Sequence, residues 1–142
     1  METLHIPILI ISSSDAPLPE LIGELRVVGK STLTQVISEH GVVDPCTEIA
    51  VVDMRGGEKR DVIICALLLR NAGRTVIVCD PRELPLDLLR DLYNFTVREK
   101  AAGRKVKTEV LLTEEAMNFL GDVSDIVAEF EKEFLGSSNS LA

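Results

Sequence analysis

The segment 48–80, EIAVVDMRGGEKRDVIICALLLRNAGRTVIVCD, decides the fold class of this 142-residue chain. Its two apolar runs, 49–52 and 75–79, have the composition of buried strands. The apolar run 62–69 between them contains strong helix formers and is followed by a glycine stop. A strand, a helix and a second strand in this order form a βαβ unit, and such units make parallel sheets. A β-hairpin is the competing interpretation, because the middle run begins with three β-branched residues.

The remaining sequence predicts further strands and helices. The apolar run His5–Ser12 predicts a first strand, and we expect its Pro7 either to precede the strand or to place it near a sheet edge. The next predicted elements are a short helix over 19–26, with 26–28 either the end of that helix or a short strand, and a helix over 32–40 capped by Ser31 and stopped by Gly41. They are followed by an amphipathic helix over 86–102, an edge strand within 105–112, and a last helical region from 114 capped by Thr113 and broken near 121–122.

These elements together predict a three-layer α/β/α sandwich around a mainly parallel sheet of four to five strands, of the Rossmann-like or flavodoxin-like kind. The length predicts one domain, which we expect over residues 1–135. The polar segment 136–142 is expected to form a flexible C-terminal tail.

Composition and charge argue against several classes of function. The net charge of −8 opposes binding to nucleic-acid phosphates and to anionic lipid, so we expect neither a nucleic-acid nor a membrane partner. The longest apolar run is far shorter than the roughly 20 residues of a membrane helix. Cys65 and Cys79 lie in apolar runs and are expected to act as small hydrophobes, whereas Cys46 follows the turn predicted at Asp44-Pro45. An odd cysteine count without a C-x-x-C pair favours a reducing, cytoplasmic location.

The candidate site follows from the ends of the two strands of the βαβ unit. Each strand ends on an aspartate, and ligands of open α/β sheets bind outside the carboxyl ends of the strands. Glycines and basic residues after the first aspartate suit the binding of an anion at the start of a helix. The sequence therefore predicts a small phosphorylated or nucleotide-like ligand, bound by residues drawn from Ser13, Ser14, Asp15, Asp53, Arg55, Gly56, Gly57, Lys59, Asp80 and Arg82. A plain βα turn with solvated charges is the competing interpretation.

The sequence does not assign an activity to this site. Carboxylates gathered at strand ends suit Mg²⁺, but aspartates at these positions also cap turns, so Mg²⁺ is a hypothesis without an assigned ligand set. The segment Gly29-Lys30-Ser31-Thr32 is not a phosphate-binding P-loop, because the motif requires a glycine where Glu24 stands. Catalytic residues and reaction type remain open.

The run 62–69 carries a second hypothesis. A helix with no polar face must be covered on more than one side. The sheet and another helix would achieve this, and so would the sheet and a partner subunit, which would make the protein a homodimer or a non-catalytic interaction module. In overall character rather than in any motif, the chain resembles small uncharacterised α/β proteins of archaea, particularly methanogens, and this resemblance implies no particular activity.

Overall fold

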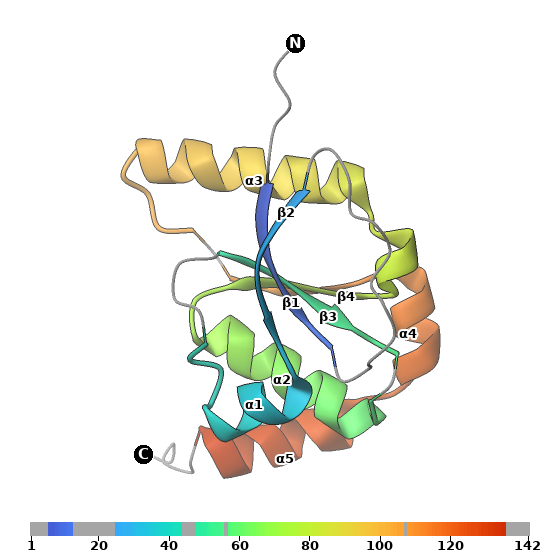
Figure 1. Ribbon diagram of the computed structural model, residues 1–142. Helices are drawn as coiled ribbons and strands as arrows, with labels where there is room; N and C mark the ends of the chain where they lie inside the picture. The colour runs from blue at the N-terminus through green and yellow to red at the C-terminus, as the bar shows by residue number, and fades with distance from the viewer. Residues whose placement is uncertain (1–5, 13–24, 44–47, 56, 107, 136–142) are drawn as a thin grey trace.

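The computed structural model describes residues 6–12, 25–43, 48–55, 57–106 and 108–135. Within them, five parallel strands form one sheet in the order β2-β1-β3-β4-β5 (Figure 1). This is the flavodoxin-like order of a doubly wound fold, which confirms the predicted α/β class. The strands are β1 (Ile6–Ile11), β2 (Leu25–Ser31), β3 (Ile49–Asp53), β4 (Thr75–Cys79) and β5 (Val110–Leu112).

Helices cover both faces of the sheet, so the sandwich has three layers (Figure 1). One face carries a core of α1, α2, α4 and α5 packed on the sheet, whereas the other is covered by α3. The helices are α1 (Leu33–Ser38), α2 (Lys59–Asn71), α3 (Leu86–Ala101), α4 (Glu114–Leu120) and α5 (Ser124–Phe134), with a short 3₁₀ turn η1 (Pro81–Glu83) before α3. No helix among the described residues combines the length and the apolar character needed to cross a membrane.

The run 62–69 is helical, which excludes the hairpin interpretation. All eight of its residues are buried, and α1 and α5 pack against α2 on the side away from the sheet. The chain itself therefore covers the run 62–69. The hypothesis that 62–69 forms a subunit interface is wrong, because none of these side chains is left at the surface; a homodimer through another surface stays a prediction.

A close backbone contact at Gly41 allows the end of α1 to pack against α2. Gly41, at the end of α1, has a φ of +83°, and a Cβ atom at this position would lie 2.4 Å from the carbonyl oxygen of Leu68 in α2. Only glycine fits both this backbone conformation and this approach. The predicted glycine stop is thus confirmed, and it also sets the packing of the two helices.

Two local predictions need correction. Pro7 lies inside a central strand, and β1 tolerates it because β3 pairs with β1 only from Leu9 onward. Ser31 is the last residue of β2 rather than a helix cap. Thr32 caps α1 instead, because its Oγ1 accepts a hydrogen bond from the backbone N–H of Gln35 at 3.1 Å.

The structure also tests the predictions for three further segments. Residues 25 and 26 belong to β2, not to the helix predicted over 19–26, whose other residues lie outside the described ones. The segment Gly29-Lys30-Ser31 lies within this strand, which agrees with the absence of a P-loop. The strand expected within 105–112 is confirmed at the sheet edge but is paired only over 110–112. The expected cap at Thr113 and the break near Gly121 are also found.

Candidate functional site

The candidate site lies where the strand order reverses. From β1 the chain proceeds to β2 on one side, whereas β3 and all later strands lie on the other side. At such a switch point the carboxyl ends of two neighbouring strands open a crevice in which open α/β sheets bind ligands. Ser12 follows β1 at this point, and Asp53 is the last residue of β3.

Asp53 is fully buried and collects four donors. Its Oδ2 accepts from the hydroxyl of Ser12 at 3.1 Å and from Nη2 of Arg55 at 2.8 Å. Its Oδ1 accepts from the backbone N–H of Arg55 at 2.8 Å and from Nε of the same residue at 3.0 Å. The carboxylate therefore closes an Asx-type turn and holds the guanidinium by two parallel bonds, which is the strong geometry for this pair of groups.

The end of β4 repeats this arrangement one strand along. The Oδ1 of Asp80 accepts from the backbone N–H and from Nε of Arg82, each at 3.0 Å, and its Oδ2 accepts from Nη2 at 2.6 Å. The two segments share an Asp-x-Arg spacing, 53–55 and 80–82. We call them the inner turn and the outer turn, since the first is next to β1 and the second is one strand further from it.

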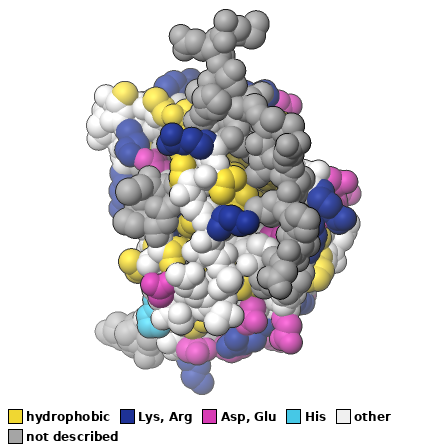
Figure 2. All heavy atoms as spheres, in the orientation of Figure 1, with side chains coloured by type: hydrophobic (Ala, Val, Ile, Leu, Met, Phe, Trp, Pro, Cys, Tyr) yellow, Lys and Arg dark blue, Asp and Glu magenta, His cyan; other side chains and the backbone are white. Residues whose placement is uncertain are grey.

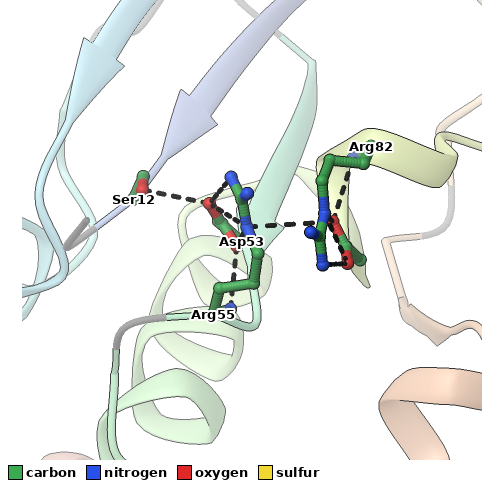
Figure 3. Close-up of polar contacts among 5 residues, drawn as sticks. Ser12, Asp53, Arg55 and Arg82 are labelled. Carbon is green, nitrogen blue, oxygen red and sulfur yellow. Dashed lines mark hydrogen bonds and ion pairs between the residues drawn. The ribbon is translucent and has the colours of Figure 1, made fainter. Parts of the chain in front are cut away.

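The two turns are joined into one charged chain. Nε of Arg55 lies 3.8 Å from Oδ1 of Asp80, so the contacts run from Ser12 through both aspartates and both arginines (Figure 3). The Arg82 guanidinium, through its hydrogen bonds, lowers the pKa of Asp80 to about 2. The hydrogen bond from Asp53 raises the pKa of Arg55. Asp80, Arg55 and Arg82 are therefore charged at neutral pH.

This arrangement leaves donors for a ligand. Each arginine uses the Nε–Nη2 side of its guanidinium on its aspartate, and a guanidinium carries five N–H donors in total. The Nη1 side of each fork can then meet a further acceptor such as phosphate or carboxylate. Beyond the outer turn the rim is acidic: a hydrogen bond with Glu83 raises the pKa of Glu115. An anion would thus approach from the side of β1 and β3.

The structure brings together four of the predicted site residues, Asp53, Arg55, Asp80 and Arg82. Gly57 is half-buried in the turn before α2. Lys59 does not join them, because its Nζ donates to the backbone carbonyl of Asp122 at 2.8 Å, between α4 and α5. The predictions for Ser13, Ser14, Asp15 and Gly56 fall outside the described residues.

Two signals in the sequence were missed. Ser12 is the first polar residue after the apolar run of β1, and it was assigned to the strand rather than to the site. The repeated Asp-x-Arg spacing places a basic side chain two residues after each terminal aspartate. That spacing alone predicts a guanidinium folded back on its own aspartate, because the backbone N–H and the side chain of the same residue face one carboxylate.

The described side chains do not provide a metal centre. Among them there is no group of three or more His, Cys, Asp or Glu residues placed to hold an ion. The oxygens of Asp53 and Asp80 are instead engaged by arginines. Cys79, next to Asp80, is no nucleophile, because burial raises the pKa of its thiol to about 12. Cys65 and Cys79 are buried free thiols, as expected for small hydrophobes.

Comparison with known proteins adds no relative: no family model matches the chain, and neither a curated protein nor a solved structure matches it. The chemistry of the site therefore rests on its geometry alone.

Proposed function

We propose that the protein binds a small anionic ligand, phosphorylated or nucleotide-like, at the carboxyl ends of β3 and β4. One observation carries the proposal: two guanidiniums from adjacent strands are held in place by two aspartates beside the switch point of the sheet. Because the aspartates orient both arginines before any ligand arrives, little side-chain entropy is lost on binding. The proposal assigns a binding function and no reaction.

The cellular setting is part of the same proposal. A cytoplasmic location suits two free thiols and a ligand of the nucleotide class. Fractionation of cells that express the tagged full-length chain tests it, and recovery of the protein outside the cytoplasm would contradict it.

The test of the site is a thermal-shift and calorimetric titration with ATP, AMP, glucose 6-phosphate and inorganic phosphate. A ligand that binds only the folded state stabilises it by about 2.7 kcal/mol at a hundredfold excess over Kd. We expect at least one of these compounds to raise Tm in the natural chain. Removal of one bidentate arginine should weaken binding by about tenfold or more, because a hydrogen bond between charged groups contributes roughly 1.5–3 kcal/mol.

Arg55→Gln and Arg82→Gln are the informative variants, and Arg90→Gln is the matched control. Arg90 is also paired with an aspartate of its own segment, Asp87 at 2.8 Å, but it lies on α3. Weaker binding in the first two variants with unchanged binding in the control supports the proposal. Absence of binding by all four compounds, or equal affinities in Arg82→Gln and Arg90→Gln, contradicts it.

A further inference from the structure

A groove lies at the opposite end of the sheet, where the amino ends of the strands lie, under the C-terminal half of α3. It consists of three adjoining cavities of about 310, 360 and 600 Å³. The first two share Glu48, Thr96 and Lys100, and the last two share Gly73 and Thr108. We call it the amino-edge groove. The volume of its first two cavities is in the range of pockets that hold small molecules.

Two buried threonines line the middle cavity, and neither hydroxyl has a hydrogen-bond partner within the described part of the chain. Thr75, at the start of β4, and Thr96, on α3, are only 6% and 8% exposed, and both line it. Neither hydroxyl makes a hydrogen bond to any other residue of the described segments. Both remain reachable from the cavity, since no fully enclosed side-chain N or O atom in those segments lacks a partner. Because both oxygens remain accessible and are unpaired within the described residues, they can hydrogen-bond to a polar ligand group or to water in the cavity.

Positive charge gathers along the groove although the chain as a whole is acidic. Four cationic residues line it, Arg70, Lys100, Arg104 and Lys105, whereas Glu48 is the only acidic residue among its described lining. The Nζ of Lys100 contacts Glu48, and Arg104 contacts Glu99. Exposed pairs of this kind are weak, so an incoming anion can exchange with them.

The other end of the groove is apolar. Pro7, Ile49, Tyr93 and Val97 line the first cavity, and it opens where the first residues of β1 have no partner in β3. In Figure 2, hydrophobic and basic side chains lie next to one another at the upper left, over the C-terminal part of α3. An apolar wall and a cationic wall therefore face the same space.

We infer that the amino-edge groove binds a small amphipathic anion, with a ring or short aliphatic body against Tyr93 and Val97. Its acidic head group meets Lys100 and Arg104, and the Thr96 hydroxyl donates to the same group. This site is separate from the two Asp-x-Arg turns, which lie at the other edge of the sheet. It does not depend on the ligand proposed there.

The chain carries its own reporter for this test. Tyr93 is the single tyrosine, and the chain has no tryptophan, so intrinsic fluorescence reports on this groove. The probe is cyclohexanecarboxylate, which is transparent where tyrosine is excited, and cyclohexylamine is the counterpart with the same ring and the opposite charge. We expect the carboxylate to change the Tyr93 emission saturably and the amine to change it at least about tenfold less effectively, because the head group must meet cations.

Variants separate the two walls and the two sites. Lys100→Gln should weaken binding of the carboxylate about tenfold, because one charge-assisted hydrogen bond is lost. Thr96→Val keeps the shape of the side chain but removes its hydroxyl, and it should weaken binding of the carboxylate about fivefold. Lys132→Gln, an exposed lysine on α5, is the matched control, and Arg55→Gln tests independence from the other edge; both should bind as the natural chain does. A linear or absent response to the carboxylate, equal binding of the amine, or equal affinities in Lys100→Gln and Lys132→Gln would overturn the inference.

Discussion

The inner and the outer turn have the same local structure in different surroundings. In each, an aspartate accepts the backbone N–H and two side-chain nitrogens of the arginine two residues later. In the inner turn the side chains of Asp53 and Arg55 are 0% and 21% exposed, whereas in the outer turn those of Asp80 and Arg82 are 9% and 65% exposed. The pairs thus differ mainly in how far their charges are removed from water.

The difference shows that the Asp-x-Arg motif determines the local hydrogen-bond geometry of each turn. The position of the turn in the sheet determines how strongly its charge pair contributes to stability. An Asp-x-Arg segment can form its contacts with no help from distant residues. The inner turn also receives the hydroxyl of Ser12, 41 positions away in the sequence, because β3 lies beside β1. The outer turn follows β4, whose other neighbour is the three-residue β5, and its arginine extends into solvent.

The largest loss of stability is expected for Asp53→Ala. The substitution removes the carboxylate that the Ser12 hydroxyl, the Arg55 backbone N–H and the partly buried Arg55 guanidinium share. We expect the free energy of unfolding to fall by about 3 kcal/mol, as for other broken buried charge pairs. Urea unfolding measures it as a lower midpoint at constant m value. Asp53→Asn, which keeps an acceptor oxygen, should lose less, and a loss in Asp53→Ala no greater than in Asp80→Ala would contradict the comparison.

A smaller effect is expected for Asp80→Ala. Because Arg82 is largely exposed, its guanidinium can turn into water when the carboxylate is removed. The loss should be about 1 kcal/mol, which is the upper end for exposed ion pairs. Asp87→Ala is the control, since Asp87 is 94% exposed in its pair with Arg90. We expect almost no change in the control, so equal urea midpoints for the two variants would refute the prediction.

The smallest effect is the pH dependence of the outer turn. The guanidinium of Arg82 lowers the pKa of Asp80 to about 2, below the value of about 3.9 for an aspartate in an unfolded chain. The folded state therefore binds this proton less readily than the unfolded state. The stabilisation is present above pH 4 and is lost as the pH falls from about 4 to about 2.

Urea unfolding of the natural chain and of Asp80→Asn at pH 5, 4, 3 and 2 checks this expectation. The advantage of the natural chain should shrink across this range, because the asparagine does not titrate. A difference that stays constant from pH 5 to pH 2 would show that the charge of Asp80 contributes nothing to stability.

Much of the fold could be predicted because its signals are local. The apolar strands, the glycine stop and the amphipathic period of α3 each lie within a short segment, and the βαβ unit follows from their order. The misplacement of Pro7 had a non-local cause: proline is excluded from a central strand only where a neighbour needs its N–H, and β3 begins to pair after that residue. The cover of α2 was undecided for the same reason, since α1 and α5 are distant in sequence.

The site was predicted in part. Asp53 and Asp80 were found because strand ends can be read from an apolar run. Ser12 was missed as a site residue, and Lys59 was included although it turns toward Asp122. Both outcomes depend on which segments become neighbours in space. The amino-edge groove had no signal, because its walls come from segments scattered between Pro7 and Thr108.

By itself, the sequence determined the parallel α/β class, the helix over 62–69 and two aspartates at strand ends, since each depends on interactions between residues close along the chain. Only the tertiary structure decided the strand order, the burial of one Asp-x-Arg turn and the exposure of the other, and the placing of cations and buried threonines around one groove. The physical reason is that desolvation and charge pairing depend on distance in space, which the order of strands sets and local propensity does not.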